Sequence, residues 1–308
     1  MSLNQKSIGS HSDAPPVRSQ GHHIHVTRDP ADILSAGYEP EASKPIGVFD
    51  SGLGGLTVLR EIHARLPHEN LIYFGDTARV PYGNKSSTTI IRYAREIVRF
   101  LLSRDVKAIV VACNTASSYA LEAIRELTDI PVLGVIDPAV RSLTQKSATD
   151  SVAGLIATKG TIASLSYEAA LKRLHGEPRL LTRACPLLVP LIEEGYADSA
   201  VADLILRDYL GPLAEQGAEY LILGCTHYPL IARAIARLYP QFKLIDSAEE
   251  TAAELKAVLA QKNMLRSEDG GRVELYVSDM TDSMRSLQQL FFQSQVDIFE
   301  VAQVGDDH

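Results

Sequence analysis

The chain has 308 residues, 45% of them hydrophobic, and a formal net charge of −8. This length suits two domains of ordinary size, each with enough apolar residues to bury a core. Lysine and arginine form no concentrated cluster, which argues against nucleic-acid binding, and no apolar run approaches the ~20 residues of a membrane span. We therefore expect a protein that contacts neither nucleic acid nor membrane.

Residues 1–44 differ from the rest of the chain because they are polar and rich in serine and histidine. They lack the apolar core of a signal peptide, so we expect a disordered N-terminal extension. His22, His23 and His25 are spaced closely enough to share a metal, but no cysteine or carboxylate completes a site around them. No metal is expected.

The expected elements of the first half are short apolar strands that alternate with helices. The helix after the first strand, for example, has Leu56, Leu59, Ile62 and Leu66 at helical spacing. The strands cover residues 45–50, 71–76, 107–113 and 130–137.

The same alternation then starts again. Strands are expected at residues 151–158, 219–225 and 243–247, with a helix over 165–174. Final helices near 248–262 are expected to return to the first half. Alternating strands and helices indicate right-handed crossovers and parallel sheets.

The sequence therefore predicts an α/β fold of two similar domains, each a parallel sheet flanked by helices, with the active site in the cleft between them. We expect the first domain to comprise residues 45–138 plus 247–300, and the second to comprise 139–246.

Three cysteines, Cys113, Cys185 and Cys225, occur in a chain with no export signal and no CxxC motif. An odd number of cysteines without these signals indicates free thiols in a reducing compartment. The expected location is cytoplasmic.

Cys113 and Cys225 lie in matching stretches, IVVACNTAS and LILGCTHYP. Each follows an expected strand and precedes an expected helix. Ligands bind at the carboxyl ends of parallel strands, and a helix N-terminus lowers the pKa of a thiol. Two such thiols facing one cleft are compatible with a redox pair, a metal site or a pair of acid/base groups. A metal site would need more ligands than the two thiols and His227 provide. A redox pair is possible, but the two cysteines of such a pair are usually close in sequence.

Polar residues beside these thiols favour acid/base chemistry. Asp50 ends the first strand, where it either caps the next helix or handles a thiol proton. His227 lies two residues after Cys225, in a place to orient that thiol. Neutral hydrogen-bonding groups come from Asn114, Thr115 and Thr226, and from the backbone of Tyr82 and Gly83.

Five segments, spread over about residues 45–290, together resemble the glutamate racemases. The resemblance implies an isomerase that interconverts L- and D-glutamate without a cofactor and supplies D-glutamate for bacterial peptidoglycan. The related aspartate racemases tend to carry Glu at the position of His227. The segments are VFDSGLGGLTVL, FGDTARVPYGNKS, VVACNTAS, LGCTHYPL and LIDS.

The resemblance also implies roles for individual residues. Cys113 and Cys225 would be the two proton donors and acceptors, assisted by Asp50 and His227 respectively. Glu193, with Glu194 adjacent, matches a further assisting carboxylate. The implied substrate contacts are Asp50, Ser51, Tyr82, Gly83, Asn114, Thr115, Thr226 and His227, with Thr158 and Thr161 as further candidates and Cys185 as a structural residue.

Two other readings stay open at this point. One is a racemase of aspartate or another amino acid, and the other is a two-lobed amino-acid binding protein without turnover. None of the five segments contains a lysine in a recognisable Schiff-base pocket, so no pyridoxal cofactor is expected. The oligomeric state is open, with a homodimer as one candidate.

Overall fold

The computed structural model describes most of the chain beyond the N-terminal extension, and His22, His23 and His25 lie outside the described residues. The expected disordered extension, residues 1–44, is too long by four residues, because residues 41–44 belong to the fold. Glu41–Ser43 is a short 3-10 helix, η1, and the Lys44 ammonium lies 3.0 Å from the Asp105 carboxylate. The described residues are 41–175, 178–280, 288–289, 291–292 and 295–305.

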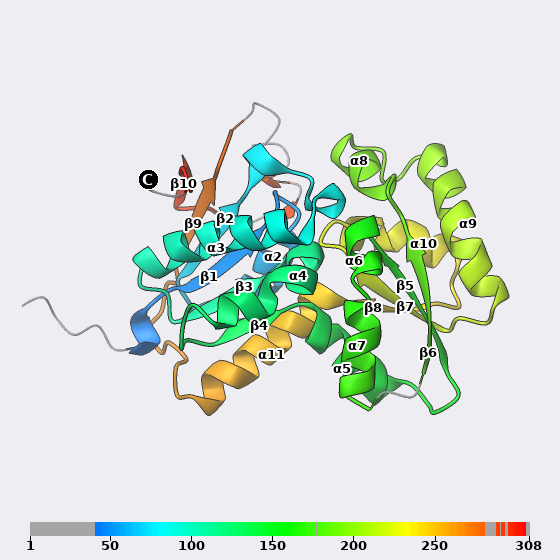
Figure 1. The fold of residues 1–308 in the computed structure, drawn as a ribbon, viewed down its shortest axis with the longest axis horizontal. Helices are drawn as coiled ribbons and strands as arrows, with labels where there is room; N and C mark the ends of the chain where they lie inside the picture. The colour runs from blue at the N-terminus through cyan, green and yellow to red at the C-terminus, as the bar shows by residue number, and fades with distance from the viewer. Residues whose placement is uncertain (1–40, 176–177, 281–287, 290, 293–294, 306–308) are drawn as a thin grey trace, which may run out of the picture. The chain divides into compact units, whose positions relative to one another are not determined.

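The first sheet is parallel and has the strand order β10-β9-β2-β1-β3-β4 (Figure 1). Its central strands are buried along their whole length, as expected for a sheet covered on both faces. The strands are β1 (Ile46–Asp50), β2 (Leu71–Gly75), β3 (Ala108–Val111), β4 (Val132–Gly134), β9 (Val273–Val277) and β10 (Ile298–Val301).

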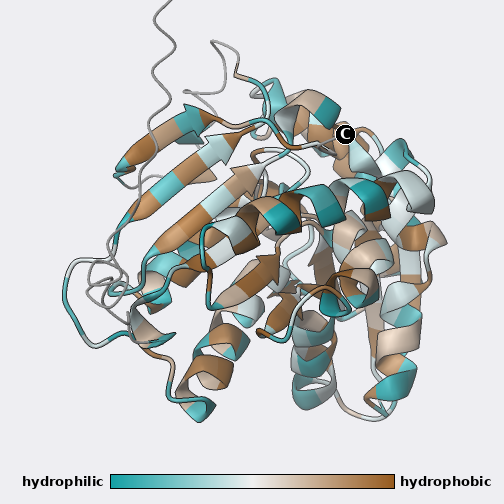
Figure 2. Ribbon diagram, turned by 60° about the vertical axis from the view of Figure 1, so that its left-hand side comes forward, coloured by the Kyte–Doolittle hydropathy of each residue, from teal (hydrophilic) through white to brown (hydrophobic). Residues whose placement is uncertain are grey.

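Helices cover both faces of this sheet. Along β1, Val48 packs in one hydrophobic cluster with α2 and α11, and Phe49 packs in another with α3 and α4. Apolar residues therefore concentrate between the layers, as the brown strands of Figure 2 show. The late helix α11 packs against α2 and also against α5 (Ile136–Lys146). The bounds are α2 (Leu56–Arg65), α3 (Ser87–Ser103), α4 (Asn114–Arg125) and α11 (Ser247–Gln261).

The second sheet is also parallel and has the order β6-β5-β7-β8. Helices α5 and α7 cover one face, and α8, α9 and α10 pack in the cluster on the other. The strands are β5 (Val152–Ala157), β6 (Arg179–Ala184), β7 (Tyr220–Gly224) and β8 (Lys243–Asp246). The helices are α5 (Ile136–Lys146), α6 (Lys159–Ala163), α7 (Ser166–Arg173), α8 (Leu188–Glu193), α9 (Ala200–Glu215) and α10 (Ala232–Leu238).

The α/β fold with two parallel sheets is confirmed, and one expected element needs correction. The strand predicted over 130–137 is only Val132–Gly134, and α5 already begins at Ile136. Pro138 lies in the first turn of α5, where a proline costs no helical hydrogen bond. The domain boundaries given above stay a prediction.

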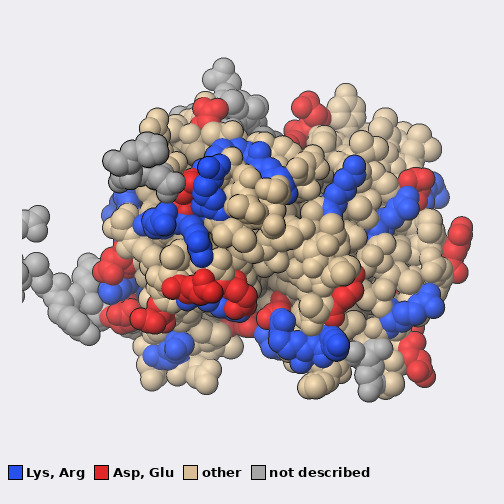
Figure 3. Space-filling view, in the orientation of Figure 1, with Lys and Arg blue, Asp and Glu red and all other residues tan. Residues whose placement is uncertain are grey.

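Hydrogen bonds join the two halves at the carboxyl ends of the strands. The Thr57 hydroxyl donates to the Thr226 carbonyl at 2.8 Å, and the Tyr119 hydroxyl donates to the Gly160 carbonyl at 2.9 Å. No helix among the described residues is long and apolar enough to cross a membrane. Acidic and basic side chains are interspersed over the face shown in Figure 3.

Candidate active site

The candidate residues lie at the carboxyl ends of strands from both sheets. Asp50 is the last residue of β1, Cys113 follows β3, Thr158 follows β5, and Cys225 follows β7. Parallel sheets place all such ends along one edge, which is where ligands bind in α/β folds. Residues far apart in the sequence thus meet at one place.

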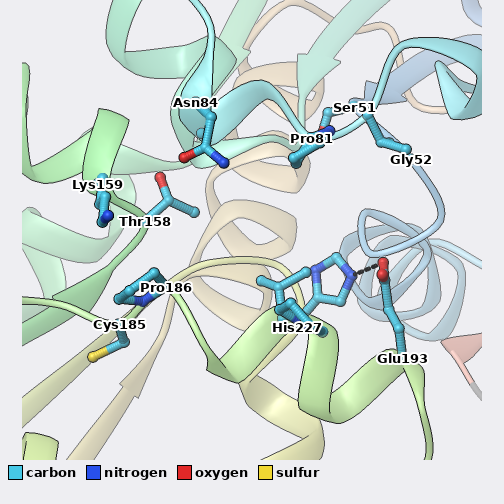
Figure 4. A pocket seen from close by; sticks show the side chains of 14 residues that line it. Ser51, Gly52, Pro81, Asn84, Thr158, Lys159, Cys185, Pro186, Glu193 and His227 are labelled. Carbon is cyan, nitrogen blue, oxygen red and sulfur yellow. Dashed lines mark hydrogen bonds and ion pairs between the residues drawn. The ribbon is translucent and has the colours of Figure 1, made fainter.

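Two adjoining cavities open here. The inner cavity, of about 50 Å³, lies between the halves, and both Cys113 and Cys225 line it. The outer cavity, of about 310 Å³, shares Ser51, Gly83 and His227 with the inner one, so it leads into it. Figure 4 shows Asn84, Thr158 and Lys159 across the outer cavity from His227 and Glu193. The expected substrate contacts that line the inner cavity are Ser51, Tyr82, Gly83, Asn114, Thr115, Thr226 and His227.

Asp50 lies behind these cavities and lines neither of them. Its side chain is buried, and Oδ2 accepts hydrogen bonds from the amides of Gly52 (3.1 Å) and Gly55 (3.0 Å). Its Oδ1 is buried without a partner. Burial raises the pKa of Asp50, while the positive charge of His227 opposes that rise. A direct contact between Asp50 and substrate stays a prediction.

Cys113 is the N-cap of α4. Its sulfur accepts from the Ala116 amide at 3.4 Å, and its thiol donates to the Ser51 hydroxyl at 3.6 Å. The sequence predicted a lowered thiol pKa here, and that prediction is wrong for Cys113. Burial raises its pKa to about 12, and the nearby Asp50 carboxylate adds to the rise. The helix N-terminus and Ser51 pull the other way but do not outweigh desolvation.

Cys225, His227 and Glu193 form a chain of polar contacts. His227 Nδ1 lies 3.8 Å from Cys225 Sγ. His227 Nε2 lies 2.9 Å from Glu193 Oε1, the contact drawn in Figure 4. Burial disfavours the charged imidazole, but the bonds to Cys225 and Glu193 outweigh it and raise the pKa of His227 to about 10. Glu193, at the end of α8, makes this contact, and the adjacent Glu194 does not. The two thiols therefore face opposite charges: a carboxylate beside Cys113 and an imidazolium beside Cys225.

Neutral polar groups complete the site; Thr115 and Thr158 line the inner cavity, and the buried Thr161 lines neither cavity. The hydroxyls of Thr115, Thr158 and Thr161 lie within 3.0–3.2 Å of one another. Asn114 Oδ1 accepts from the Tyr167 hydroxyl at 2.6 Å, so the amide orientation is fixed, and Nδ2 is buried without a partner. That nitrogen is a donor available to a bound anion.

A buried hydrogen-bond network centred on Asp76 lies beneath the Tyr82–Gly83 loop, and the sequence analysis assigned no role to its residues. Asp76 is fully buried and accepts hydrogen bonds from Arg79 Nε (2.8 Å), Ser278 Oγ (2.9 Å) and Tyr82 Oη (2.5 Å). Arg79 also pairs with Glu96. Asp76 and Arg79 both lie within the FGDTAR segment that carries the family resemblance. The sequence alone, however, does not indicate that their side chains contact Tyr82.

Cys185 follows β6, and it lines the outer cavity but not the inner one. Its thiol lies 3.5 Å from the Arg183 carbonyl, and burial raises its pKa to about 12. A structural role for Cys185 stays a prediction. Among the residues that the structure describes, no three histidine, cysteine or acidic side chains are grouped to hold a metal ion.

Comparisons with known proteins match this arrangement to one family. The sequence model described as Asp/Glu/hydantoin racemase matches residues 46–255. The chain is 52% identical over 239 residues to a protein of Geobacter metallireducens named glutamate racemase, a match that covers 77% of this chain and 88% of the relative.

Solved structures agree with the sequence match. The glutamate racemase of Francisella tularensis in complex with D-glutamate superposes with a TM-score of 0.81 at 36% identity, covering 85% of this chain and 98% of that one. The Thermus thermophilus glutamate racemase in complex with β-chloro-D-alanine gives a TM-score of 0.78 at 43% identity, covering 86% and 98%. The chain therefore belongs to the Asp/Glu/hydantoin racemase family, and its similarity to proteins named glutamate racemase places it among the amino-acid racemases, which are isomerases.

Proposed function

We propose that the chain interconverts L- and D-glutamate by direct proton transfer at Cα, using Cys113 and Cys225 as its two acid/base groups and no cofactor. The observation that carries the proposal is that both thiols line the same inner cavity while coming from different sheets. A planar carbanion between two such groups can be protonated from either side.

Each direction of the reaction moves two protons. In one direction the Cys225 thiolate takes the Cα proton of L-glutamate, and the Cys113 thiol donates its proton to the opposite face, giving D-glutamate. Cys225 then carries a proton and Cys113 is the thiolate, which is the state that accepts D-glutamate. The assignment of the L-enantiomer to Cys225 rests on the family resemblance.

The charges beside the two thiols suit these starting states. Burial and Asp50 keep Cys113 protonated, and the imidazole of His227, whose pKa is raised to about 10, places a positive charge beside Cys225. Glu193 in turn holds the imidazole by its other nitrogen. A protonated Cys113 is the form that the proposed direction from L-glutamate requires.

The Cα–H of an amino acid is a weak acid, so the developing negative charge needs preorganised donors in a dry site. Asn114 Nδ2 is such a donor, and it is fixed by the bond from Tyr167 to Oδ1. We assign Asn114 to the substrate α-carboxylate. The remaining polar contacts fall to Ser51, Thr115, Thr226, the Thr158–Thr161 pair and the backbone of Tyr82–Gly83.

Glutamate is proposed as the substrate for two reasons. The relatives are named glutamate racemase, and one of the matched structures is described in complex with D-glutamate. The proposed role is to supply D-glutamate for peptidoglycan in the cytoplasm. Racemisation of aspartate or of another amino acid is the competing activity.

Chiral chromatography of purified protein with L-glutamate tests the proposal. We expect conversion to an equal mixture of enantiomers, and the same endpoint from D-glutamate. L-Aspartate at the same concentration should react far more slowly. Faster racemisation of aspartate would replace the substrate, and binding of glutamate without any conversion would favour the binding-protein reading.

Independence from cofactors has its own test. Dialysis against EDTA, followed by hydroxylamine treatment to remove any pyridoxal group, should leave the rate of racemisation unchanged. A loss of activity that zinc or pyridoxal phosphate restores would contradict the proposed mechanism.

A further inference from the structure

The two imidazole nitrogens of His227 make contacts that need a single ring orientation. Nδ1 must face Cys225 Sγ at 3.8 Å and the Thr226 hydroxyl at 3.4 Å, while Nε2 faces Glu193 at 2.9 Å. The torsion about the Cβ–Cγ bond of histidine is broad, so torsional preference alone does not hold a ring in one plane. Packing against the ring must do so.

One side of that packing comes from the Gly-rich loop after β1. A Cβ on Gly54 would lie 2.3 Å from His227 Cε1 and 2.4 Å from His227 Nδ1. The backbone of Gly54 therefore lies directly against the imidazole and leaves it no room to move that way.

The other contact comes from Phe291, near the end of the described chain. The Phe291 and His227 rings have centroids 5.3 Å apart and planes at 82°, an edge-to-face arrangement that aromatic pairs favour. Phe291 is fully buried, and its carbonyl accepts a hydrogen bond from Arg60 Nη1 at 3.4 Å. Arg60 lies on α2, directly after the loop that holds Gly54.

We infer that Phe291 is a positioning residue for His227: it fixes the ring plane that lets the imidazole contact Cys225 and Glu193 together. The inference rests on the proposed role of His227 in proton transfer. Phe291 lies outside residues 46–255, so the segment that matches the family does not contain this part of the site.

Its neighbour supplies a matched control. Phe292 is the same residue type and equally buried, but its ring lies 5.8 Å from that of His63 on α2 and not beside His227. Removing either ring opens a similar space in the same hydrophobic cluster. Only the removal of the Phe291 ring allows the imidazole of His227 to turn.

The experiment compares Phe291→Leu with Phe292→Leu in the full chain, in both directions of glutamate racemisation. For Phe291→Leu we expect kcat to fall about tenfold and KM to change by less than about twofold. The expected loss is smaller than the about 10²–10⁴-fold that a positioned acid/base group contributes, because His227 itself is still present. The deuterium isotope effect for Cα-labelled glutamate should rise, because proton transfer becomes more rate-limiting. Phe292→Leu should lose a similar amount of thermal stability but keep kcat and the isotope effect.

Equal losses of kcat in both variants, or no loss in Phe291→Leu, would overturn the inference and leave the proposed function intact. Failure of the wild-type protein and of Phe292→Leu to racemise glutamate would instead contradict the proposed function. If Phe291→Leu does not fold, Phe291→Met takes its place, because methionine fills more of the space without restoring a ring. The same loss of kcat and rise in isotope effect are then expected.

Discussion

At the scale of single residues, the two candidate thiols differ in what surrounds them more than in where they lie. Cys113 has Asp50 nearby and a pKa raised to about 12, whereas Cys225 has the imidazole of His227, whose own pKa is raised to about 10. The surroundings therefore give a substrate-free enzyme in which one thiol holds its proton and the other faces a cation. In the proposed mechanism, the protonated form of Cys113 is the one that reacts with L-glutamate.

The helpers of the two thiols should affect kinetics unequally. Asp50→Asn acts beside Cys113 and His227→Asn acts beside Cys225, so each should lower kcat more in one direction than in the other. General acid/base assistance is worth about 10²–10⁴-fold. Because the equilibrium constant between enantiomers is unity, kcat/KM must fall equally in both directions, and the asymmetry must be sought in kcat and KM separately. If both variants keep the kcat and KM of the wild-type protein, the assignment is wrong.

Gly54 should be intolerant of a side chain for a reason that involves chemistry rather than the fold. In Gly54→Ala the new Cβ displaces His227, and a displacement of about 1 Å can cost about 10²-fold in rate. We expect a loss of kcat/KM of that order with the fold retained, measured by racemisation and circular dichroism. Gly211→Ala is the control, because its Cβ would meet only Tyr239 Oη at 3.6 Å. Full activity in Gly54→Ala would show that His227 does not need its position.

Sequence reasoning named most of the residues that line the inner cavity but did not predict their arrangement. Cys113, Cys225 and His227 were identified from their place after apolar runs and from the family resemblance, and they do line one cavity. The raised pKa of Cys113 was missed because burial is a property of the assembled site and not of the local helix end. The contact of Phe291 with His227 joins residues 64 positions apart, and no local pattern in the sequence indicates it.

At the scale of elements, the short loop that carries Tyr82 and Gly83 depends on a buried carboxylate. Asp76 holds it through the hydroxyl of Tyr82 and the guanidinium of Arg79. Tyr82 lies in the 3-10 helix η3 (Tyr82–Asn84) and is almost completely buried. The cavity wall formed by this loop is therefore held from behind.

Removing one hydroxyl tests this support. Tyr82→Phe deletes the bond to Asp76, and hydrogen bonds to charged groups contribute about 1.5–3 kcal/mol to stability. We expect KM for glutamate to rise severalfold as the loop loosens. Tyr220→Phe deletes a tyrosine hydroxyl bond of the same length, to the neutral Lys146 carbonyl. Because Tyr220 lines neither cavity, this variant should lower stability without changing KM. Unchanged KM in Tyr82→Phe would argue against the support.

The predicted elements were correct where strands are buried on both faces. β1, β2 and β3 are continuous apolar runs, as central parallel strands are, and they were expected. β6 was not, because it is an edge strand with Arg179 and Arg183 in a mostly half-exposed segment. β9 and β10 were missed too, since they are added to the sheet from the end of the chain.

At the scale of the whole molecule, protonation of His227 couples the site to stability. Its pKa is about 10 in the folded protein against an ordinary value of 6.5, so folding favours the protonated ring. The resulting stabilisation is fully present below pH 6.5 and is lost as the pH rises through about 10.

Urea unfolding of the wild-type protein and of His227→Asn at several pH values between 6.5 and 10 checks this coupling. The free energy of unfolding of the wild-type protein should fall more steeply with pH than that of the variant. The difference between the two should therefore shrink towards pH 10. Parallel curves would show that the ring has no raised pKa in the folded state.

The central claim is that two thiols from two sheets act on opposite faces of one carbon, and racemisation in D2O tests it most directly. With L-glutamate, the early D-glutamate product should carry deuterium at Cα, while the remaining L-glutamate stays almost wholly protiated, as mass spectrometry of the separated enantiomers would show. Cys113→Ala and Cys225→Ala should each abolish racemisation, and Cys185→Ala should stay active with a modest loss of stability. Early deuterium in the remaining L-glutamate, or substantial racemisation by either Cys113→Ala or Cys225→Ala, would contradict the two-thiol account.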